Sequence, residues 1–309
     1  IEPTNLSVKT EEGLSQKLVY PAALVTYGGK QVAVRLLQNR VGATPEEILN
    51  NSIQNLEYAF STAIKKATTT GVLRVGFTEG HNELTDIQLE DAMKALQDGY
   101  EVGRVNLEAI SFAGLDKLKV LIIPKPNTAF TEAEKYKVDY FVMKGGRVFW
   151  VLDNVNAELD SLRGISEQLA FPKKLNLDDM LFKYGVRINY DLIADMNCAQ
   201  IPINVGNVGG QGQIQMVPWL FYPIFVPSSV HPVVKNLDGI RSEFANTIDT
   251  IGVPGVKKTV ILASSPFSRK VSTPATLSLQ MIEQEPDPKE FQSEPKAMGV
   301  VLEGVFPSD

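Results

Sequence analysis

The sequence is poor in reactive and metal-binding side chains, because it contains one cysteine, Cys198, and two histidines, His81 and His231. A single cysteine excludes an internal disulfide and a zinc site built from four cysteines. Long apolar runs are also missing, since no segment approaches the roughly 18 consecutive apolar residues of a membrane span. We therefore expect no membrane-spanning helix within this stretch.

Positive charge is in short supply as well, with a formal net charge of -6 and a pI near 5.2. Binding to a phosphate backbone needs a clustered positive face that displaces counterions, so the sequence predicts no nucleic-acid partner. The chain opens at Ile1 without a methionine, a basic segment or an apolar signal core. We expect it to be an excised soluble portion of a longer protein.

The 309 residues, 44% of them hydrophobic, suffice for about two domains with sizeable cores. Thr68–Gly71 resembles a hinge. Before it, two apolar runs around Tyr27–Lys30 predict a hairpin, and the capping box Thr44–Glu47 begins a helix that extends to residue 67. Five apolar residues share one face of this helix: Leu49, Ile53, Leu56, Phe60 and Ile64. We predict a small N-terminal α+β module over residues 1–70 and a larger domain over residues 71–309.

Residues 72–152 alternate between apolar strands and capped helices. Capping boxes at Thr85–Gln88 and Thr131–Glu134 begin two helices, and Gly145-Gly146 ends the second. The segment Lys119–Pro124 is apolar from Val120 onward, which is typical of a strand buried on both faces. This pattern predicts an α/β fold with a mainly parallel sheet flanked by helices.

Beyond residue 160 the pattern is less regular. It indicates a helix over residues 177–184 and extended segments over residues 186–192, 219–226, 259–263 and 298–306. The most hydrophobic point of this half is the aromatic cluster Trp219–Phe225. Large apolar side chains usually lie inside a protein, so we predict that this cluster is core, with an exposed docking patch as the alternative.

The polar segment Glu79-Gly80-His81-Asn82-Glu83 follows the first strand of the predicted sheet. In an extended backbone Glu79, His81 and Glu83 would share one side, at a spacing that a metal could use. The glycine and the helix cap at Thr85 instead favour an exposed strand-to-helix turn without a metal or a catalytic role. Because open α/β sheets bind ligands at the carboxyl ends of their strands, Glu79, His81, Asn82 and Glu83 are our candidate ligand- or partner-binding residues.

Cys198 is a candidate nucleophile only in principle. It lies in Asp195–Gln200, without the glycine neighbours that permit a strained nucleophile elbow. A buried, inert thiol is the expectation, and no sequence pattern brings His231 to it as a base. We therefore predict no catalytic residues and no cofactor.

Several segments, in this order, resemble the gliding-motility ABC-transporter accessory protein GldG family. They are Gly80-His81-Asn82-Glu83, Leu121–Pro124, Asp139–Arg147, Tyr184–Val186, Trp219–Pro223, His231-Pro232 and Leu302–Phe306. The resemblance covers most of the chain, and it rests on the order and spacing of these segments rather than on any single motif.

The resemblance implies an extracytoplasmic domain on the periplasmic side of the inner membrane, anchored through segments outside this chain. Its implied partners are the permease and ATPase subunits of an ABC transporter. The implied core is similar to the class I glutamine amidotransferase (flavodoxin-like) fold, without the cysteine nucleophile of that fold.

The resulting hypothesis is a non-catalytic accessory component, linked to gliding motility or export, that acts through protein contacts. The segment Glu79–Glu83 and the aromatic cluster are its candidate contact surfaces. Two alternatives stay open at this point. A solute-binding protein would need two lobes of similar size, and a degenerate amidotransferase-like hydrolase would use Cys198 or His81.

Overall fold

The computed structural model describes residues 4–10, 13–37, 44–69, 71, 73–164, 167–208, 211–228, 230–235, 237–283 and 286–308. The chain separates into two compact units, Ile1–Leu73 and Arg74–Asp309. The boundary predicted from the sequence lies between residues 70 and 71. None of the helices within the described ranges is long and apolar enough to cross a membrane.

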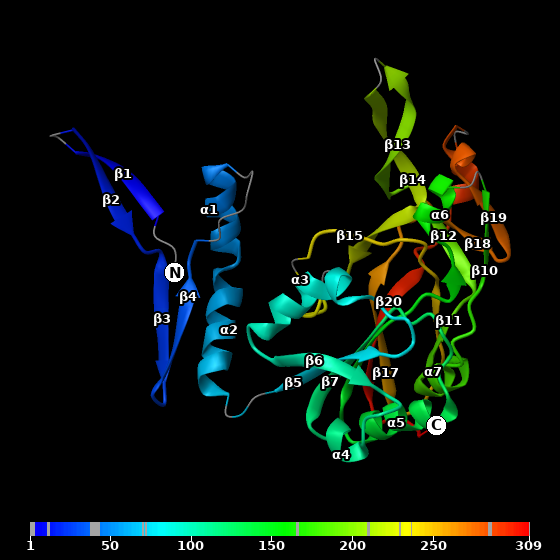
Figure 1. The fold of residues 1–309 in the computed structure, drawn as a ribbon, viewed down its shortest axis with the longest axis horizontal. Coiled ribbons are helices and arrows are strands. Elements are labelled where there is room, and N and C mark those ends of the chain that lie inside the picture. Colours follow the sequence, from blue (N-terminus) through cyan, green and yellow to red (C-terminus); the bar gives the residue numbers. More distant parts are fainter. Residues whose placement is uncertain are drawn as a thin grey trace. The chain divides into compact units, whose positions relative to one another are not determined.

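In its described residues, the first unit contains two antiparallel strand pairs and two helices (Figure 1). Its elements are β1 (Thr4–Thr10), β2 (Gly13–Val19), β3 (Ala22–Tyr27), β4 (Lys30–Arg35), α1 (Pro45–Gln54) and α2 (Leu56–Thr68). The predicted hairpin is the β3–β4 pair, whose turn residues Gly28 and Gly29 have φ of 55° and 83°. Thr44 caps α1 through the predicted capping box with Glu47.

The single helix predicted over residues 44–67 is two helices in the structure. They meet at Asn55, whose backbone and side-chain amides both donate to the Asn51 carbonyl. Helix α2 packs on β3 and β4 and buries Ala63 and Ala67. Leu49, Ile53 and Ile64 remain 51–57% exposed, so the predicted apolar face is only partly covered.

The second unit begins with a four-stranded parallel sheet in the order β6-β5-β7-β8. Its elements are β5 (Arg74–Glu79), α3 (Asp86–Gln97), β6 (Glu101–Asn106), α4 (Phe112–Leu115), β7 (Leu118–Pro124), α5 (Glu132–Met143) and β8 (Arg147–Val151). Both predicted capping boxes are present, at the starts of α3 and α5.

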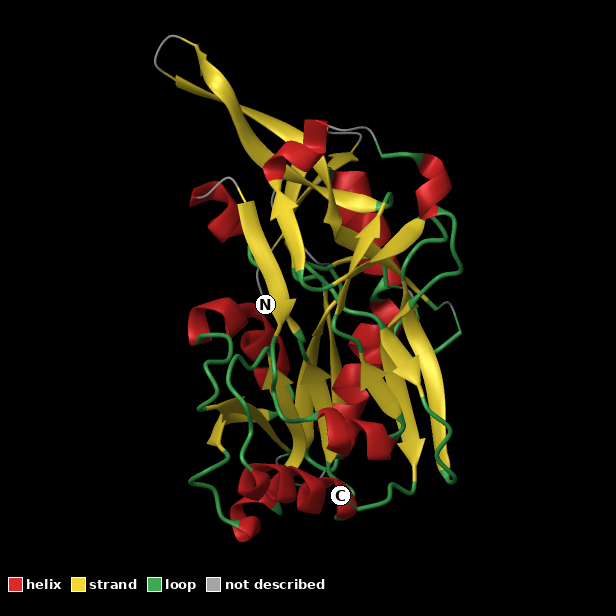
Figure 2. Cartoon of the chain, turned by 90° about the vertical axis from the view of Figure 1, so that its right-hand side faces the viewer, coloured by secondary structure: helices red, strands yellow, loops and turns green. Residues whose placement is uncertain are grey.

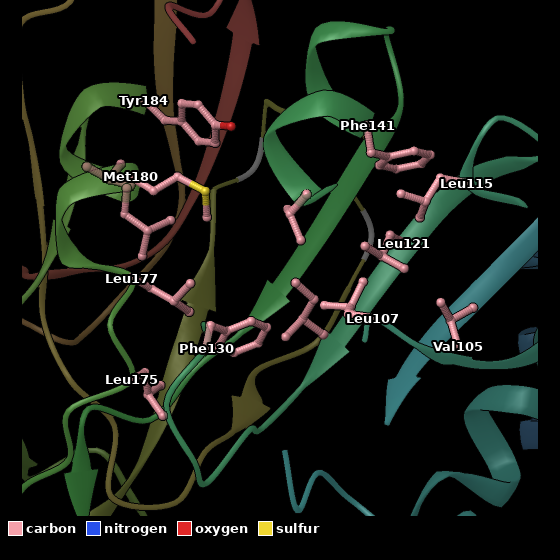
Figure 3. Close-up of a cluster of buried hydrophobic side chains, with 14 residues drawn as sticks. Val105, Leu107, Leu115, Leu121, Phe130, Phe141, Leu175, Leu177, Met180 and Tyr184 are labelled. Atoms are coloured by element: carbon pink, nitrogen blue, oxygen red, sulfur yellow. The ribbon is translucent and has the colours of Figure 1, made fainter. Parts of the chain in front are cut away.

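Helices cover both faces of this sheet, as predicted. On one face Leu89 of α3 packs with Val75, Phe77 and Ile122. On the other face Leu121 and Ile123 of β7 are fully buried beside α5, in a cluster that continues through Phe130 to Met180 and Tyr184 of α7 (Figure 3). The strand β7 lies between β5 and β8 rather than at a sheet edge.

The strands after β8 pair antiparallel, so the expectation of a mainly parallel sheet is wrong for this part of the unit. They form the sheets β19-β10-β9, β11-β16, β12-β18 and β13-β14-β17-β20, with β15 beside β14. Their bounds are β9 (Val155–Asn156), β10 (Glu167–Pro172), β11 (Val186–Ile188), β12 (Asp191–Asp195), β13 (Cys198–Val208), β14 (Gln211–Pro227), β15 (Ile240–Arg241), β16 (Ile248–Thr250), β17 (Val256–Ala263), β18 (Ser268–Ser272), β19 (Ala275–Ser278) and β20 (Ala297–Gly304). The helices of this part are α6 (Leu159–Gly164), α7 (Asp178–Tyr184), η1 (Leu279–Glu283) and η2 (Pro288–Phe291).

The aromatic cluster of β14 is core. Trp219, Phe221, Tyr222 and Phe225 are each at most 6% exposed and belong to the interior of the second unit. The core prediction is therefore confirmed, and the aromatic cluster is not a contact surface. The far end of the β13–β14 hairpin projects beyond the other elements of this unit (Figures 1 and 2).

Leu121→Ala tests whether the parallel sheet is the core of the second unit. Leu121 is fully buried, so removing its side chain is expected to lower the free energy of unfolding by about 2–5 kcal/mol. Urea denaturation followed by tryptophan fluorescence measures this. Ile87→Ala, at a side chain that is 86% exposed, is the control and should change stability by less than about 0.5 kcal/mol. Equal effects of the two substitutions would contradict the assignment.

Candidate functional site

The carboxyl ends of the parallel strands lie at one edge of the sheet. The strands lie in the order β6-β5-β7-β8. The chain therefore adds β6 on one side of β5 and then crosses to the other side to add β7 and β8. Open α/β sheets bind ligands at such a switch point, outside the carboxyl ends of the strands. The loops that meet there are residues 80–85 after β5 and residues 125–131 after β7.

Hydrogen bonds tie these two loops together. The His81 carbonyl accepts from the backbone amides of Asn127 and Thr128 at 2.7 and 3.2 Å. The Asn127 side-chain amide donates to the Asn82 carbonyl at 2.7 Å. Gly80 adopts φ of 115°, and a Cβ there would lie 3.3 Å from the Asn106 amide nitrogen, so glycine fits both the backbone and the space.

The predicted site residues divide into two groups. Glu79 and Asn82 are exposed, as the sequence indicates, whereas His81 is 4% exposed and the Glu83 side chain only 2%. The expectation of a fully exposed turn is therefore wrong for His81 and Glu83. The backbone is left-handed at Gly80 and at Asn82, where φ is 53°, so the chain is not extended and the simple alternation of sides fails.

His81 is held between an aromatic ring and two carboxylates. Its ring stacks on Phe130, with centroids 4.0 Å apart and planes 7° from parallel. Its Nε2 lies 3.2 Å from Glu134 Oε2, and its Nδ1 lies 3.7 Å from Glu83 Oε1. The same Glu134 oxygen accepts from the backbone and hydroxyl of Thr131 in the capping box of α5.

These contacts shift the pKa values of all three groups. Glu83 raises the pKa of His81 and, together with Glu134, outweighs the lowering effect of burial. Burial raises the pKa of Glu83, but its contacts with His81 and Thr78 outweigh this and leave the pKa lowered. Burial also raises the pKa of Glu134, and Thr131 and His81 reverse the shift. The two carboxylates therefore favour the protonated form of the buried His81 imidazole.

The contacts of this buried group link the loop after β5 to the first turn of α5. Within the described part of the chain, no set of three or more histidine, cysteine or acidic side chains is arranged to hold a metal ion. His81 and Glu83 are also too buried to touch a substrate, and the Glu134 side chain is 11% exposed. We call His81, Glu83 and Glu134 the buried triad.

A second polar group, which the sequence analysis missed, lies at the same edge. Lys125 follows β7 with φ of 54°, and its ammonium lies 3.2 Å from Asp153 and 3.1 Å from Glu158. The Lys173 ammonium donates to Asn127 Oδ1 at 2.7 Å. The segment Lys125–Thr128 directly follows a buried strand, and this position could have identified Lys125 as a site residue from the sequence. Lys173 follows β10, and no sequence pattern marks it as a site residue.

Charge and burial shift the pKa values in this second group. Burial raises the pKa of Asp153 against the attraction of Lys125. Burial lowers the pKa of Lys125, but Asp153 and Glu158 outweigh this and leave it raised. Burial lowers the pKa of Lys173, where the charge of Lys125 opposes the attraction of Asp153. Lys173 is therefore the less compensated of the two lysines.

Cys198 lies outside the parallel sheet. It is the half-buried first residue of β13, a strand of an antiparallel hairpin. Burial, followed by the nearby charge of Asp195, raises the pKa of its thiol, which disfavours the reactive thiolate. The other histidine, His231, accepts from the backbone amide of Val233 at Nδ1.

The second unit is thus a mixed α/β domain with a parallel sheet and a polar carboxyl edge. Residues 73–309 match the protein family described as ABC-type uncharacterized transport system. The chain belongs to this family, and it is an auxiliary component of an ABC-type transport system. No curated protein matches the sequence at a significant level.

Among solved structures, the chain is similar to one described as the mmIFT52 N-terminal domain. The two are 15% identical with a TM-score of 0.45, over 65% of this chain and 77% of that one. It is also similar to a ThuA-like protein from Bacteroides uniformis, at 16% identity and a TM-score of 0.33, over 65% of this chain and 71% of that one.

The buried triad should make stability depend on pH. The folded pKa of His81 is raised above 6.5, so its contribution is fully present below pH 6.5 and is lost as pH rises through the folded value. We expect urea denaturation between pH 6 and 9 to show a stability loss that His81→Gln removes. His231→Gln, which leaves the triad intact, is the control and assigns the two histidine signals in an NMR titration. A His81 signal that titrates below pH 6.5 would contradict the triad.

Cys198 should react slowly in the folded chain, because its thiol is half-buried and its pKa is raised. We expect a maleimide to label the native chain at least about tenfold more slowly than the urea-denatured chain. The double variant Cys198→Ala/Lys119→Cys, with a thiol at an exposed position, should label at similar rates in both states. Equally fast labelling of native Cys198 would support the hydrolase alternative.

Proposed function

We propose that the chain is the extracytoplasmic domain of an accessory protein in an ABC-transporter system linked to gliding motility or export. In this proposal the domain lies on the periplasmic side of the inner membrane and is anchored by segments outside this chain. Membership of the ABC-type transport family over residues 73–309 carries the proposal. The resemblance of its segments to the GldG family supplies the link to gliding motility.

The proposed core is a class I glutamine amidotransferase-like, flavodoxin-like fold. The strand order β6-β5-β7-β8 supports this, because it equals the first four strands of the flavodoxin-like order 2-1-3-4-5. Helices on both faces of the sheet agree with the same architecture. The antiparallel strands after β8 are an elaboration of this core.

The proposed mode of action is protein contact without catalysis. Amidotransferases of this class use a cysteine at a strand-to-helix elbow, whereas Cys198 begins a strand of an antiparallel hairpin. The triad at the carboxyl edge is buried and paired, so its charges hold the loops in place. The exposed residues Glu79 and Asn82 then form the proposed contact surface for the permease, and the ATPase belongs to the same complex through the permease.

Co-purification of the membrane-anchored full-length protein with its transporter subunits tests this function. We expect the permease and the ATPase to be retained by the unsubstituted protein and to be retained much less by Glu79→Arg, which reverses a charge at the carboxyl edge. Lys119→Glu, at an exposed residue near the opposite end of the same sheet, should leave co-purification unchanged. Failure of the unsubstituted protein to retain either subunit would overturn the accessory role.

A further inference from the structure

The loops at the switch point hold an unusual backbone. Asn82 and Lys125 are both left-handed, with φ of 53° and 54°, and neither is glycine. Such conformations are unfavourable for residues with a side chain and cluster at binding sites, where the surrounding structure enforces them. Here Asn127 provides that support, because its side chain bonds both the Asn82 carbonyl and the Lys173 ammonium.

Among the described residues, no carboxylate is in direct contact with the Lys173 ammonium. Lys125 takes both nearby carboxylates, Asp153 and Glu158, whereas Lys173 forms no ion pair with any described residue. An ammonium group has three N–H donors, and the neutral Asn127 oxygen accepts one of them. Burying a charged group without a partner of opposite charge is unfavourable. An anion that binds to the half-buried Lys173 would therefore stabilise its charge.

We propose that this edge binds a carboxylate group, with Lys173 as its counter-ion and the exposed side-chain amide of Asn82 as a second donor. One ammonium without an ion-pair contact matches one carboxylate. A phosphate dianion fits less well, because Asp153 and Glu158 lie around the neighbouring lysine and would repel its second charge. The lowered pKa of Lys173 agrees with this, since a bound anion would restore the usual value.

This inference rests on the proposed function, for which it names the chemistry of contact. The carboxylate belongs to an acidic side chain of a polypeptide partner or to a free organic acid. Both sources present a carboxylate to Lys173. They differ in that the first also requires room for a peptide backbone beside the carboxylate.

Binding can be measured with the chain of residues 1–309 labelled with ¹⁵N. Addition of acetate is expected to shift the amide signals of Asn82, Asn127 and Lys173 in a saturable way, whereas acetamide, which has the same shape without the charge, should not. Lys173→Met should weaken acetate binding at least about tenfold, as loss of a charged hydrogen bond predicts. Lys174→Met, at the exposed neighbouring lysine, should leave it unchanged.

Two further titrations identify the source of the carboxylate. The first titration compares a blocked hexapeptide that contains one aspartate with the same peptide carrying asparagine instead. If only the aspartate peptide shifts the amide signals of Asn82, Asn127 and Lys173, the carboxylate comes from a polypeptide partner. Succinate binding without peptide binding indicates a free organic acid. Absence of saturable shifts, or equal acetate affinity in Lys173→Met, would overturn the site. Neither of these two results depends on co-purification, so the site and the accessory role can fail separately.

Discussion

The ring of His81 links the two loops that meet at the middle of the carboxyl edge. It stacks on Phe130, and its two nitrogens face Glu83 and Glu134. Burying charge is costly unless it is paired, so His81 and the two carboxylates each stabilise the charged form of the other. The first turn of α5 depends on the same contact, because its capping box uses the same Glu134 oxygen.

The rigidity of the edge follows from this contact. The His81 carbonyl anchors the loop after β7 through two backbone amides, and Asn127 reaches back to the loop after β5. With both loops fixed, the left-handed conformations of Asn82 and Lys125 are maintained by their surroundings rather than by their own preference. A surface that is ordered before contact loses less entropy on binding, which suits a site for a partner.

The local parts of the fold could be predicted and the distant parts could not. The capping boxes at Thr85 and Thr131 act within four residues, and the apolar strand β7 carries its own signal, so the parallel sheet follows from sequence. The pairing of β12 with β18 joins segments almost eighty residues apart and has no local pattern. The burial of His81 could not be predicted for the same reason, since it depends on contacts with Phe130 and Glu134, about fifty residues further along the chain.

The distribution of charge explains how an edge rich in titratable groups can serve recognition. General acids and bases must reach the substrate with a free proton or lone pair. The buried triad is paired within itself, and Lys125 is paired with Asp153 and Glu158. In the proposed non-catalytic role, paired groups of this kind fix the geometry of the loops. The groups that the edge presents outward include the Glu79 carboxylate, the Asn82 amide and the Lys173 ammonium, and in the proposed role they recognise charge without changing it.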